Sequence, residues 1–155
     1  MSETLKKLGI VPFFTQQLAD AGLLQNRLGR VTSVQRSRTT VVCESGERIV
    51  ELSAALLQAA AIDRPTVGDW VVLDESLSKI NQVLERKSLF KRLGAGRTSE
   101  IQPIAANIDI LFIVTSCNEE FKESRLERYL ALCAEAGAMP VIVLTKADLV
   151  DDVDD

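Results

Sequence analysis

The 155-residue sequence predicts two kinds of structure in series, a small all-β barrel and then the start of a parallel α/β domain. Two observations support this order. Between residues 28 and 86, five short runs rich in β-branched residues alternate with turn signals, which is typical of a small barrel. After residue 107, two continuous apolar runs flank a segment of helical periodicity, which is typical of neighbouring strands in a parallel sheet.

The first 27 residues precede the barrel pattern, and we expect residues 1–27 to form an N-terminal extension with one short helix. Pro12 suits the first turn of that helix, and Gly22 suits the position just past its end. The sequence therefore predicts a helix over residues 12–21.

Five strands are predicted next: three over residues 28–34, 39–43 and 48–52, a fourth that follows a turn within residues 66–74, and a fifth over residues 79–86. Gly46 suits a tight turn between the second and third strands, and residues 53–62 predict a helical or irregular connection. This order favours an OB-type (oligonucleotide/oligosaccharide-binding) barrel over residues 28–92, with an SH3-like barrel as the nearest competitor.

Positive charge is concentrated in the barrel region. Residues 27–97 contain 12 Lys and Arg against 8 Asp and Glu, whereas residues 98–155 contain 4 against 12. A basic surface can approach phosphate, although two ordinary solvated surfaces explain the same counts. The candidate nucleic-acid-binding residues are Arg30, Arg36, Arg38, Lys79, Arg86 and Lys87.

Aromatic residues are scarce in the same region, where Trp70 and Phe90 are the two present, and we expect Trp70 to lie in the core. Single-stranded nucleic acids usually stack their bases on aromatic side chains. RNA binding by this barrel would therefore depend mainly on phosphate contacts and shape.

A linker is expected over residues 93–107, because Gly94 and Gly96 loosen this segment and Pro103 interrupts it. Residues 108–155 then predict the first βαβ of an incomplete α/β domain. Its two strands, over 108–116 and 139–146, are expected to be buried on both faces, with a helix over 119–137 between them.

Thr145-Lys146-Ala147-Asp148 follows the second of these strands, and ligands bind at the carboxyl ends of strands in open parallel sheets. A carboxylate at Asp148 can accept two parallel hydrogen bonds from the ring N–H and the amino group of guanine. Lys146 can lay its aliphatic stem along the base, and Thr145 can orient the loop through its hydroxyl. The same four residues also suit an ordinary polar turn, so the motif alone is weak.

Several classes of protein are disfavoured by the composition. No apolar run approaches the roughly 20 residues that span a bilayer, and the N-terminus lacks the pattern of a signal peptide. The chain has no histidine, the commonest general base and metal ligand. Cys43, Cys117 and Cys133 are far apart and odd in number, which argues against a disulfide framework or a zinc site. We expect a cytoplasmic protein with no membrane partner.

The segment Thr145-Lys146-Ala147-Asp148 resembles the guanine-specificity motif of GTPases, usually Asn-Lys-x-Asp. A phosphate loop of the form GxxxxGK[ST] does not precede it, and that order is the hallmark of circularly permuted GTPases. Further similarity rests on "GRV" before a strand, "VGDWV" at 67–71, "IAAN" at 104–107 with Arg97, Gln102 and Asp109, and "RLERYL" at 125–130. From residue 28 to 150 the chain resembles the ribosome small-subunit-dependent GTPase A family (RsgA, also called YjeQ or EngC).

The resemblance implies an OB-type barrel that contacts small-subunit rRNA, then a circularly permuted, P-loop GTPase-like α/β domain, and then a zinc-binding domain. It implies GTP and Mg as ligands, Zn in the missing C-terminal domain, the small ribosomal subunit as partner, and GTP hydrolysis during late subunit maturation. It assigns guanine binding to Thr145, Lys146 and Asp148, with Thr145 in place of the usual Asn.

By the same resemblance the chain is an N-terminal fragment, which should be catalytically inactive because the phosphate loop is absent. Two alternatives remain open from the residues alone. One is a stand-alone RNA-binding OB module without catalytic activity, and the other is a barrel that binds proteins. Residues outside the guanine motif also have structural explanations: Asp69 can shape its turn, and Asn107 can tether the linker.

Overall fold

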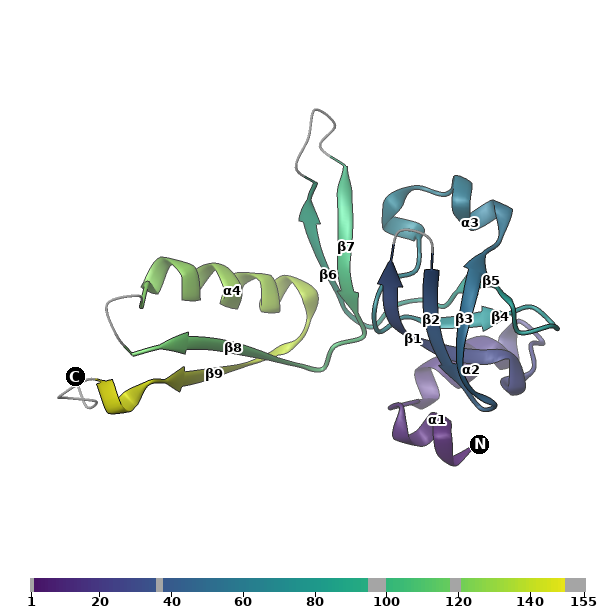
Figure 1. Cartoon of the computed structure of the whole chain (residues 1–155), viewed down its shortest axis with the longest axis horizontal. Helices are drawn as coiled ribbons and strands as arrows, with labels where there is room; N and C mark the ends of the chain where they lie inside the picture. The colour runs from purple at the N-terminus through teal and green to yellow at the C-terminus, as the bar shows by residue number, and fades with distance from the viewer. Residues whose placement is uncertain (1, 36–37, 95–99, 118–120, 150–155) are drawn as a thin grey trace. The chain divides into compact units, whose positions relative to one another are not determined.

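The structure is a computed structural model that describes residues 2–35, 38–94, 100–117 and 121–149. It divides into two compact units, Met1–Asn107 and Ile108–Asp155, and each is described by itself (Figure 1). The first unit contains α1 (Glu3–Lys7), α2 (Pro12–Asp20), η1 (Gln25–Arg27), β1 (Leu28–Gln35), β2 (Arg38–Cys43), β3 (Gly46–Leu52), α3 (Ala54–Gln58), η2 (Ala61–Asp63), β4 (Trp70–Leu73), β5 (Lys79–Val83), β6 (Leu89–Leu93) and β7 (Ile101–Ala106). The second contains β8 (Ile110–Ser116), α4 (Glu123–Ala136), β9 (Met139–Thr145) and η3 (Ala147–Leu149).

Strands β1 to β5 form a closed barrel in the order β1-β2-β3-β5-β4, and β4 pairs with β1 to complete the ring. The β3–β5 pair is parallel, while the other pairs of the barrel are antiparallel. The five predicted strands are therefore confirmed, and the barrel is of the OB type. Gly29 of β1 lies close to the paired strand β2: a Cβ at this position would lie 2.3 Å from Cγ1 of Val41, which favours glycine here.

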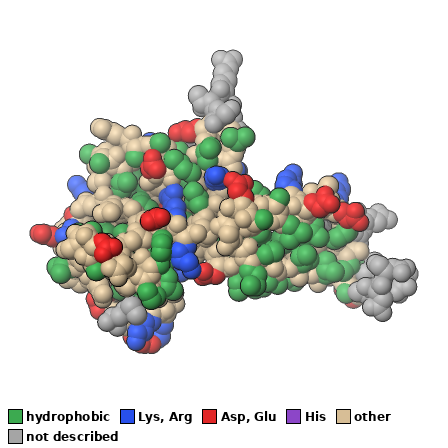
Figure 2. All heavy atoms as spheres, turned by 180° about the vertical axis from the view of Figure 1, so that it is seen from behind, with side chains coloured by type: hydrophobic (Ala, Val, Ile, Leu, Met, Phe, Trp, Pro, Cys, Tyr) green, Lys and Arg blue, Asp and Glu red, His purple; other side chains and the backbone are tan. Residues whose placement is uncertain are grey.

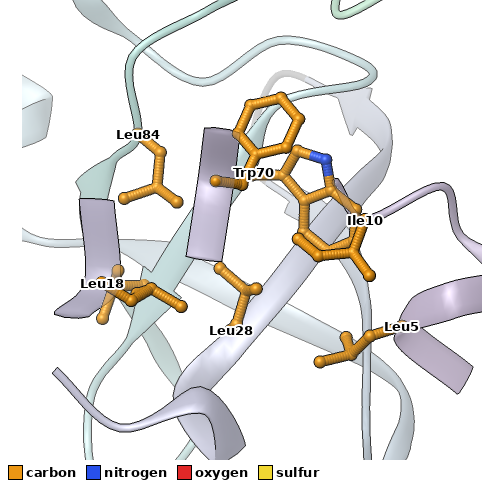
Figure 3. Packing of buried hydrophobic residues seen from close by; sticks show 8 residues of the cluster. Leu5, Ile10, Leu18, Leu28, Trp70 and Leu84 are labelled. Atoms are coloured by element: carbon orange, nitrogen blue, oxygen red, sulfur yellow. The ribbon is translucent and has the colours of Figure 1, made fainter. Parts of the chain in front are cut away.

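Two hydrophobic clusters hold this unit together, and strand alternation in β4 separates them. Val71 and Leu73 point into the barrel, where they pack with Val31, Val41, Cys43, Val50 and Ile80. Trp70 and Val72 point the opposite way and pack with Leu5, Ile10, Phe14, Leu18, Leu28 and Leu84 (Figure 3). All four residues of β4 are buried for this reason.

The expected N-terminal extension contains the predicted helix, and the structure adds that this segment packs into the core of the first unit. Helix α2 lies almost where the sequence predicts, but its buried residues Phe14 and Leu18 pack against the barrel. Helix α1 was not predicted, because five residues are too few for helical periodicity to show. Leu5 is its buried residue, at 1% exposure.

A linker was expected over residues 93–107, but the structure places the end of β6 and the whole of β7 in this segment. Strands β6 and β7 form an antiparallel pair, from Leu89 opposite Ala106 to Leu93 opposite Ile101. Pro103 is tolerated because it lies opposite Lys91, next to a register shift. β7 is joined to the barrel by hydrogen bonds from Ala106 N to Val67 O, 2.8 Å, and from Thr66 Oγ1 to Ile104 O, 3.1 Å. Gly96 and Arg97 lie outside the described residues.

The second unit is a parallel strand pair with one helix, as the sequence predicts. β8 and β9 are paired from Ile110 opposite Met139 to Ser116 opposite Thr145. Helix α4 ends at Gly137, whose left-handed φ of 75° is accessible to glycine without a Cβ penalty.

Burial on both faces of these strands, however, is not what the structure shows. Ile113 is 6% exposed, whereas its neighbours Phe112 and Val114 are each 64% exposed. In β8, Ile113 is thus covered, whereas its neighbours on the opposite face are accessible. In β9, Ile142 and Leu144 are also accessible, although the strand register places them on the same face as Ile113. Hydrophobic side chains gather on the surface of this unit in Figure 2. Across the part of the chain that the structure describes, no helix is long and apolar enough to cross a membrane.

Candidate functional site

The predicted guanine motif lies where the two parallel strands of the second unit end. Ser116, the last residue of β8, is paired with Thr145, the last residue of β9. The carboxyl ends of both strands therefore meet at one edge, and Lys146 to Asp148 continue from that edge. This is the position at which parallel α/β sheets bind ligands.

Backbone geometry at this edge is defined by contacts from β8. The Oγ1 hydroxyl of Thr145 donates to the carbonyl oxygen of Thr115, at 3.1 Å. The carbonyl oxygen of Thr145 accepts a hydrogen bond from the backbone N–H of Cys117, at 3.0 Å. Both polar groups of Thr145 that face β8 are therefore engaged by main-chain atoms.

The loop then turns sharply. Lys146 has a φ of 60°, in the left-handed region that residues with a Cβ rarely adopt. A single 3₁₀ turn follows, closed by the Leu149 N–H donating to the Lys146 carbonyl oxygen at 3.1 Å. The side chain of Asp148 is exposed within this turn. The structure thus brings Thr145, Lys146 and Asp148 together on one exposed loop.

This loop offers a carboxylate to solvent at a fixed backbone position. Guanine presents two adjacent donors, its ring N–H and its amino group, and a carboxylate matches them with two parallel bonds. Adenine presents an unprotonated ring nitrogen in the equivalent place and would repel the carboxylate. Thr115 of β8 and Cys117, which directly follows β8, contact Thr145 through their main-chain atoms. They were not predicted, because such contacts leave no side-chain pattern.

Arg86 is one of the predicted nucleic-acid contacts, and in the structure its guanidinium is hydrogen-bonded within the barrel unit. Its Nε and Nη2 donate to the two carboxylate oxygens of Asp69, both at 2.8 Å. The same guanidinium also donates to the carbonyl oxygens of Ile62 and Arg64. Asp69 is fully buried and Arg86 is 14% exposed, so this bidentate ion pair is a structural tie inside the barrel unit.

Arg30, another predicted nucleic-acid contact, is also hydrogen-bonded within this unit. Its guanidinium donates to the carbonyl oxygens of Leu8 at 2.5 Å, Asn107 at 3.1 Å and Gly68 at 3.3 Å. Its Cζ also lies 5.7 Å from the centre of the Trp70 ring. These contacts connect the N-terminal helices, the barrel and the end of β7.

The remaining candidates are exposed on separate elements. Arg38 begins β2, Lys79 begins β5, and Lys87 follows the barrel before β6. Arg36 lies outside the described residues. Asp74, on the loop before Lys79, has its pKa lowered to about 2, mainly by the hydrogen bond from Ser76 and also by the N–H groups of Ser78 and Lys79.

The motif residues "VGDWV" and "IAAN" form a structural clasp, which we define as Gly68, Asp69 and Asn107. A Cβ at Gly68, whose φ is 91°, would lie 2.0 Å from the carbonyl oxygen of Ala106. Asp69 accepts from the Thr66 N–H at 2.8 Å. Asn107, with φ of 57°, accepts from the Lys87 N–H at 2.9 Å and donates to Gly68 O at 3.1 Å. These two hydrogen bonds agree with the structural alternative given for Asn107, that it tethers the chain at this point.

Within the described residues, no group of three or more His, Cys, Asp or Glu side chains is arranged to hold a metal ion.

Comparisons with known proteins agree with these features. The family model described as RsgA GTPase matches residues 83–155. A protein from Vibrio parahaemolyticus named "Small ribosomal subunit biogenesis GTPase RsgA 2" is 45% identical over 154 residues, covering 99% of this chain and 41% of the relative. A protein from Listeria innocua named "Small ribosomal subunit biogenesis GTPase RsgA 1" is 41% identical over 150 residues, covering 96% and 42%. The chain thus spans about two fifths of the length of these curated relatives.

A solved structure, "Crystal structure of YjeQ from Thermotoga maritima", superimposes with a TM-score of 0.60 at 28% identity, covering 81% of this chain and 43% of that chain. The match to the Vibrio parahaemolyticus relative extends through the N-terminal helices, which the packing in the structure also makes part of the folded unit.

Proposed function

The chain belongs to the RsgA GTPase family, and from that premise we propose that it supplies the rRNA-binding barrel and the guanine-reading loop of a cytoplasmic GTPase. The GTPase acts in biogenesis of the small ribosomal subunit. The observation that carries the proposal is the position of Thr145, Lys146 and Asp148 at the shared carboxyl edge of a parallel strand pair.

Asp148 reads guanine in this proposal, and the stem of Lys146 covers the base. The described residues fit the nucleobase end of GTP, because an exposed carboxylate stands on a loop whose backbone is held at Thr145. The sequence contains no GxxxxGK[ST] loop, so we assign no residue of this chain to the phosphates or to Mg. When bound, Mg neutralises charge on the phosphoryl group being transferred. We assign no zinc ligand to this chain either.

The 155 residues alone should not hydrolyse GTP, because they contain no phosphate loop. They should bind guanosine weakly, because most contacts to GTP are made to its phosphates. Titration of the ¹⁵N-labelled chain with guanosine, with adenosine as control, tests this directly. We expect guanosine to shift the amide resonances of residues 145–149, with a dissociation constant of about 1–10 mM. Equal shifts with adenosine, or no shifts with either nucleoside, would show that the loop does not recognise guanine. That result would favour the stand-alone RNA-binding module.

The barrel makes the proposed contact with rRNA mainly through phosphate. Its support is the basic balance of residues 27–97 together with the exposed side chains of Arg38 and Lys79. Two further arginines predicted for this role, Arg30 and Arg86, carry less weight in the proposal because their guanidinium groups are hydrogen-bonded within the barrel unit. The proposed surface is therefore smaller than the sequence indicated.

Sedimentation of the chain with purified small ribosomal subunits, at several salt concentrations, tests the rRNA contact. The double variant Arg38→Glu and Lys79→Glu should weaken binding and lower the salt-dependence slope by about 1.5 to 2. The matched control is Lys6→Glu with Lys7→Glu, which changes the same charge on α1, where both side chains are exposed. Equal losses in the two double variants would show nonspecific attraction instead of a barrel surface.

A further inference from the structure

Thr145 stands where GTPases usually carry an asparagine, and its hydrogen bonds indicate what the threonine does there. Its hydroxyl donates to Thr115 O at 3.1 Å, and its own carbonyl oxygen accepts from Cys117 N at 3.0 Å. Both partners are main-chain atoms at the end of β8. The hydroxyl is therefore directed at the neighbouring strand, and its one proton is used there.

The next residue explains why such a brace is needed. Lys146 has a φ of 60°, and this left-handed conformation is disfavoured for every residue that has a Cβ. A backbone in such a region persists where the surrounding structure over-determines it. Thr145 is fixed from both of its sides immediately before this turn, and the Leu149 N–H closes the turn on the Lys146 carbonyl oxygen immediately after it.

We propose that Thr145 is a positioning residue and not a base contact: by bonding the Thr115 carbonyl oxygen, it holds the left-handed turn at Lys146 that presents Asp148 to guanine. This inference rests on the proposed guanine site. In this proposal Asp148 alone determines which nucleobase binds. Thr145 determines what fraction of the molecules has the loop in the conformation that binds. Loss of the brace lowers the apparent affinity by that fraction and leaves the preference between bases unchanged.

Thr145→Val tests the proposal, because valine keeps the β-branched shape at the end of β9 and removes the hydroxyl. We expect guanosine to bind about five-fold more weakly, as for the loss of one ordinary hydrogen bond, with the same discrimination against adenosine. Amide hydrogen exchange at residues 146–149 should accelerate in the free variant. Unchanged affinity together with unchanged exchange would overturn the proposal, and so would a selective loss of guanosine over adenosine discrimination.

Two further variants keep the test decisive. Thr115→Val removes the neighbouring hydroxyl but keeps the carbonyl oxygen that accepts the bond, so it should bind guanosine like the wild-type chain. Thr145→Ser keeps a hydroxyl and should retain binding within about two-fold. A five-fold loss in Thr145→Ser would contradict the proposal, and this holds even if Thr145→Val fails to fold. A wild-type chain that shows no guanosine shift is a different result, since it rejects the guanine site itself.

Discussion

In the unit of residues 1–107 an aspartate forms an ion pair inside the fold, whereas in the unit of residues 108–155 Thr145, Lys146 and Asp148 are exposed where β9 ends. Asp69 is fully buried against Arg86, and Asp148 is exposed on its turn. Both aspartates belong to motifs that carry the family resemblance. The comparison teaches that a motif residue can serve the fold, as Asp69 does, and that burial distinguishes it from Asp148, for which we propose a ligand role.

Among substitutions that test this comparison, we expect the largest loss of stability at Asp69. Asp69→Ala removes the partner of a guanidinium that is 14% exposed and also releases the Thr66 N–H. Leaving a buried charge unpaired costs about 3–5 kcal/mol of unfolding free energy. Urea unfolding followed by Trp70 fluorescence measures it.

Asp148→Ala is the matched control, because this aspartate is exposed in the other unit. It should change the free energy of unfolding by less than about 0.5 kcal/mol. If the two aspartate variants lost the same amount of stability, burial would not distinguish the structural role of Asp69 from the role proposed for Asp148.

A second large effect is expected in the N-terminal helices, which the structure makes part of the barrel unit. Phe14 is 2% exposed and lies 5.7 Å from Trp70 between ring centres. Phe14→Ala should cost about 3–5 kcal/mol, because it leaves a cavity in the cluster shown in Figure 3. The neighbouring Phe13 is 38% exposed, so Phe13→Ala should cost less than about 1 kcal/mol. Equal, small losses of stability in the two variants would show that residues 1–27 do not contribute to the core of the barrel unit.

An intermediate effect distinguishes the two faces of β8 in the second unit. Ile113→Ala should destabilise this unit by about 2–3 kcal/mol, because the side chain is 6% exposed on the covered face. Phe112→Ala, one residue earlier on the exposed face, should change stability by less than about 0.5 kcal/mol. Hydrogen exchange of the β8 and β9 amides reports on each variant. A greater loss for Phe112→Ala would mean that its face is covered in solution.

The smallest effect concerns the acid end of the pH range. The pKa of Asp74 is lowered from 3.8 to about 2, chiefly by the hydrogen bond from Ser76 Oγ, 2.7 Å from Oδ2. Because the folded pKa lies below the unfolded value, the contribution of Asp74 to stability is present above pH 3.8 and is lost as the pH falls toward 2. NMR titration of the carboxyl group should give the lowered midpoint, and Ser76→Ala should raise it. A midpoint near 3.8 in the wild-type chain would refute the Ser76 contact.

Much of this fold could be predicted from the sequence, because local patterns carry it. The five barrel strands, α2 and the βαβ unit all follow from alternation, turn residues and helical spacing. The β6–β7 pair was missed because Gly94 and Pro103 are breaker signals in a segment whose pairing depends on contacts with Val67 and Thr66. The N-terminal packing was missed because it depends on the opposite faces of β4.

The candidate guanine loop could be predicted for a different reason: its side chains point to solvent, so their chemistry can be read without knowing their neighbours. The basic barrel residues could not be sorted in that way. In the sequence Arg30 and Arg86 cannot be distinguished from Arg38, and only the structure shows that their guanidinium groups bond to Leu8, Asn107 and Asp69. Charge counts identify a basic region, but tertiary contacts decide which cations remain available.

Guanine recognition by Asp148 is the central claim, and one substitution tests it most directly. Asp148→Asn replaces an acceptor oxygen with an N–H donor, which suits the additional carbonyl of xanthine and opposes the amino group of guanine. In ¹⁵N titrations of the variant, xanthosine should shift the resonances of residues 145–149, and the guanosine response of the wild-type chain should disappear. A variant that still binds guanosine as the wild-type chain does would contradict the account.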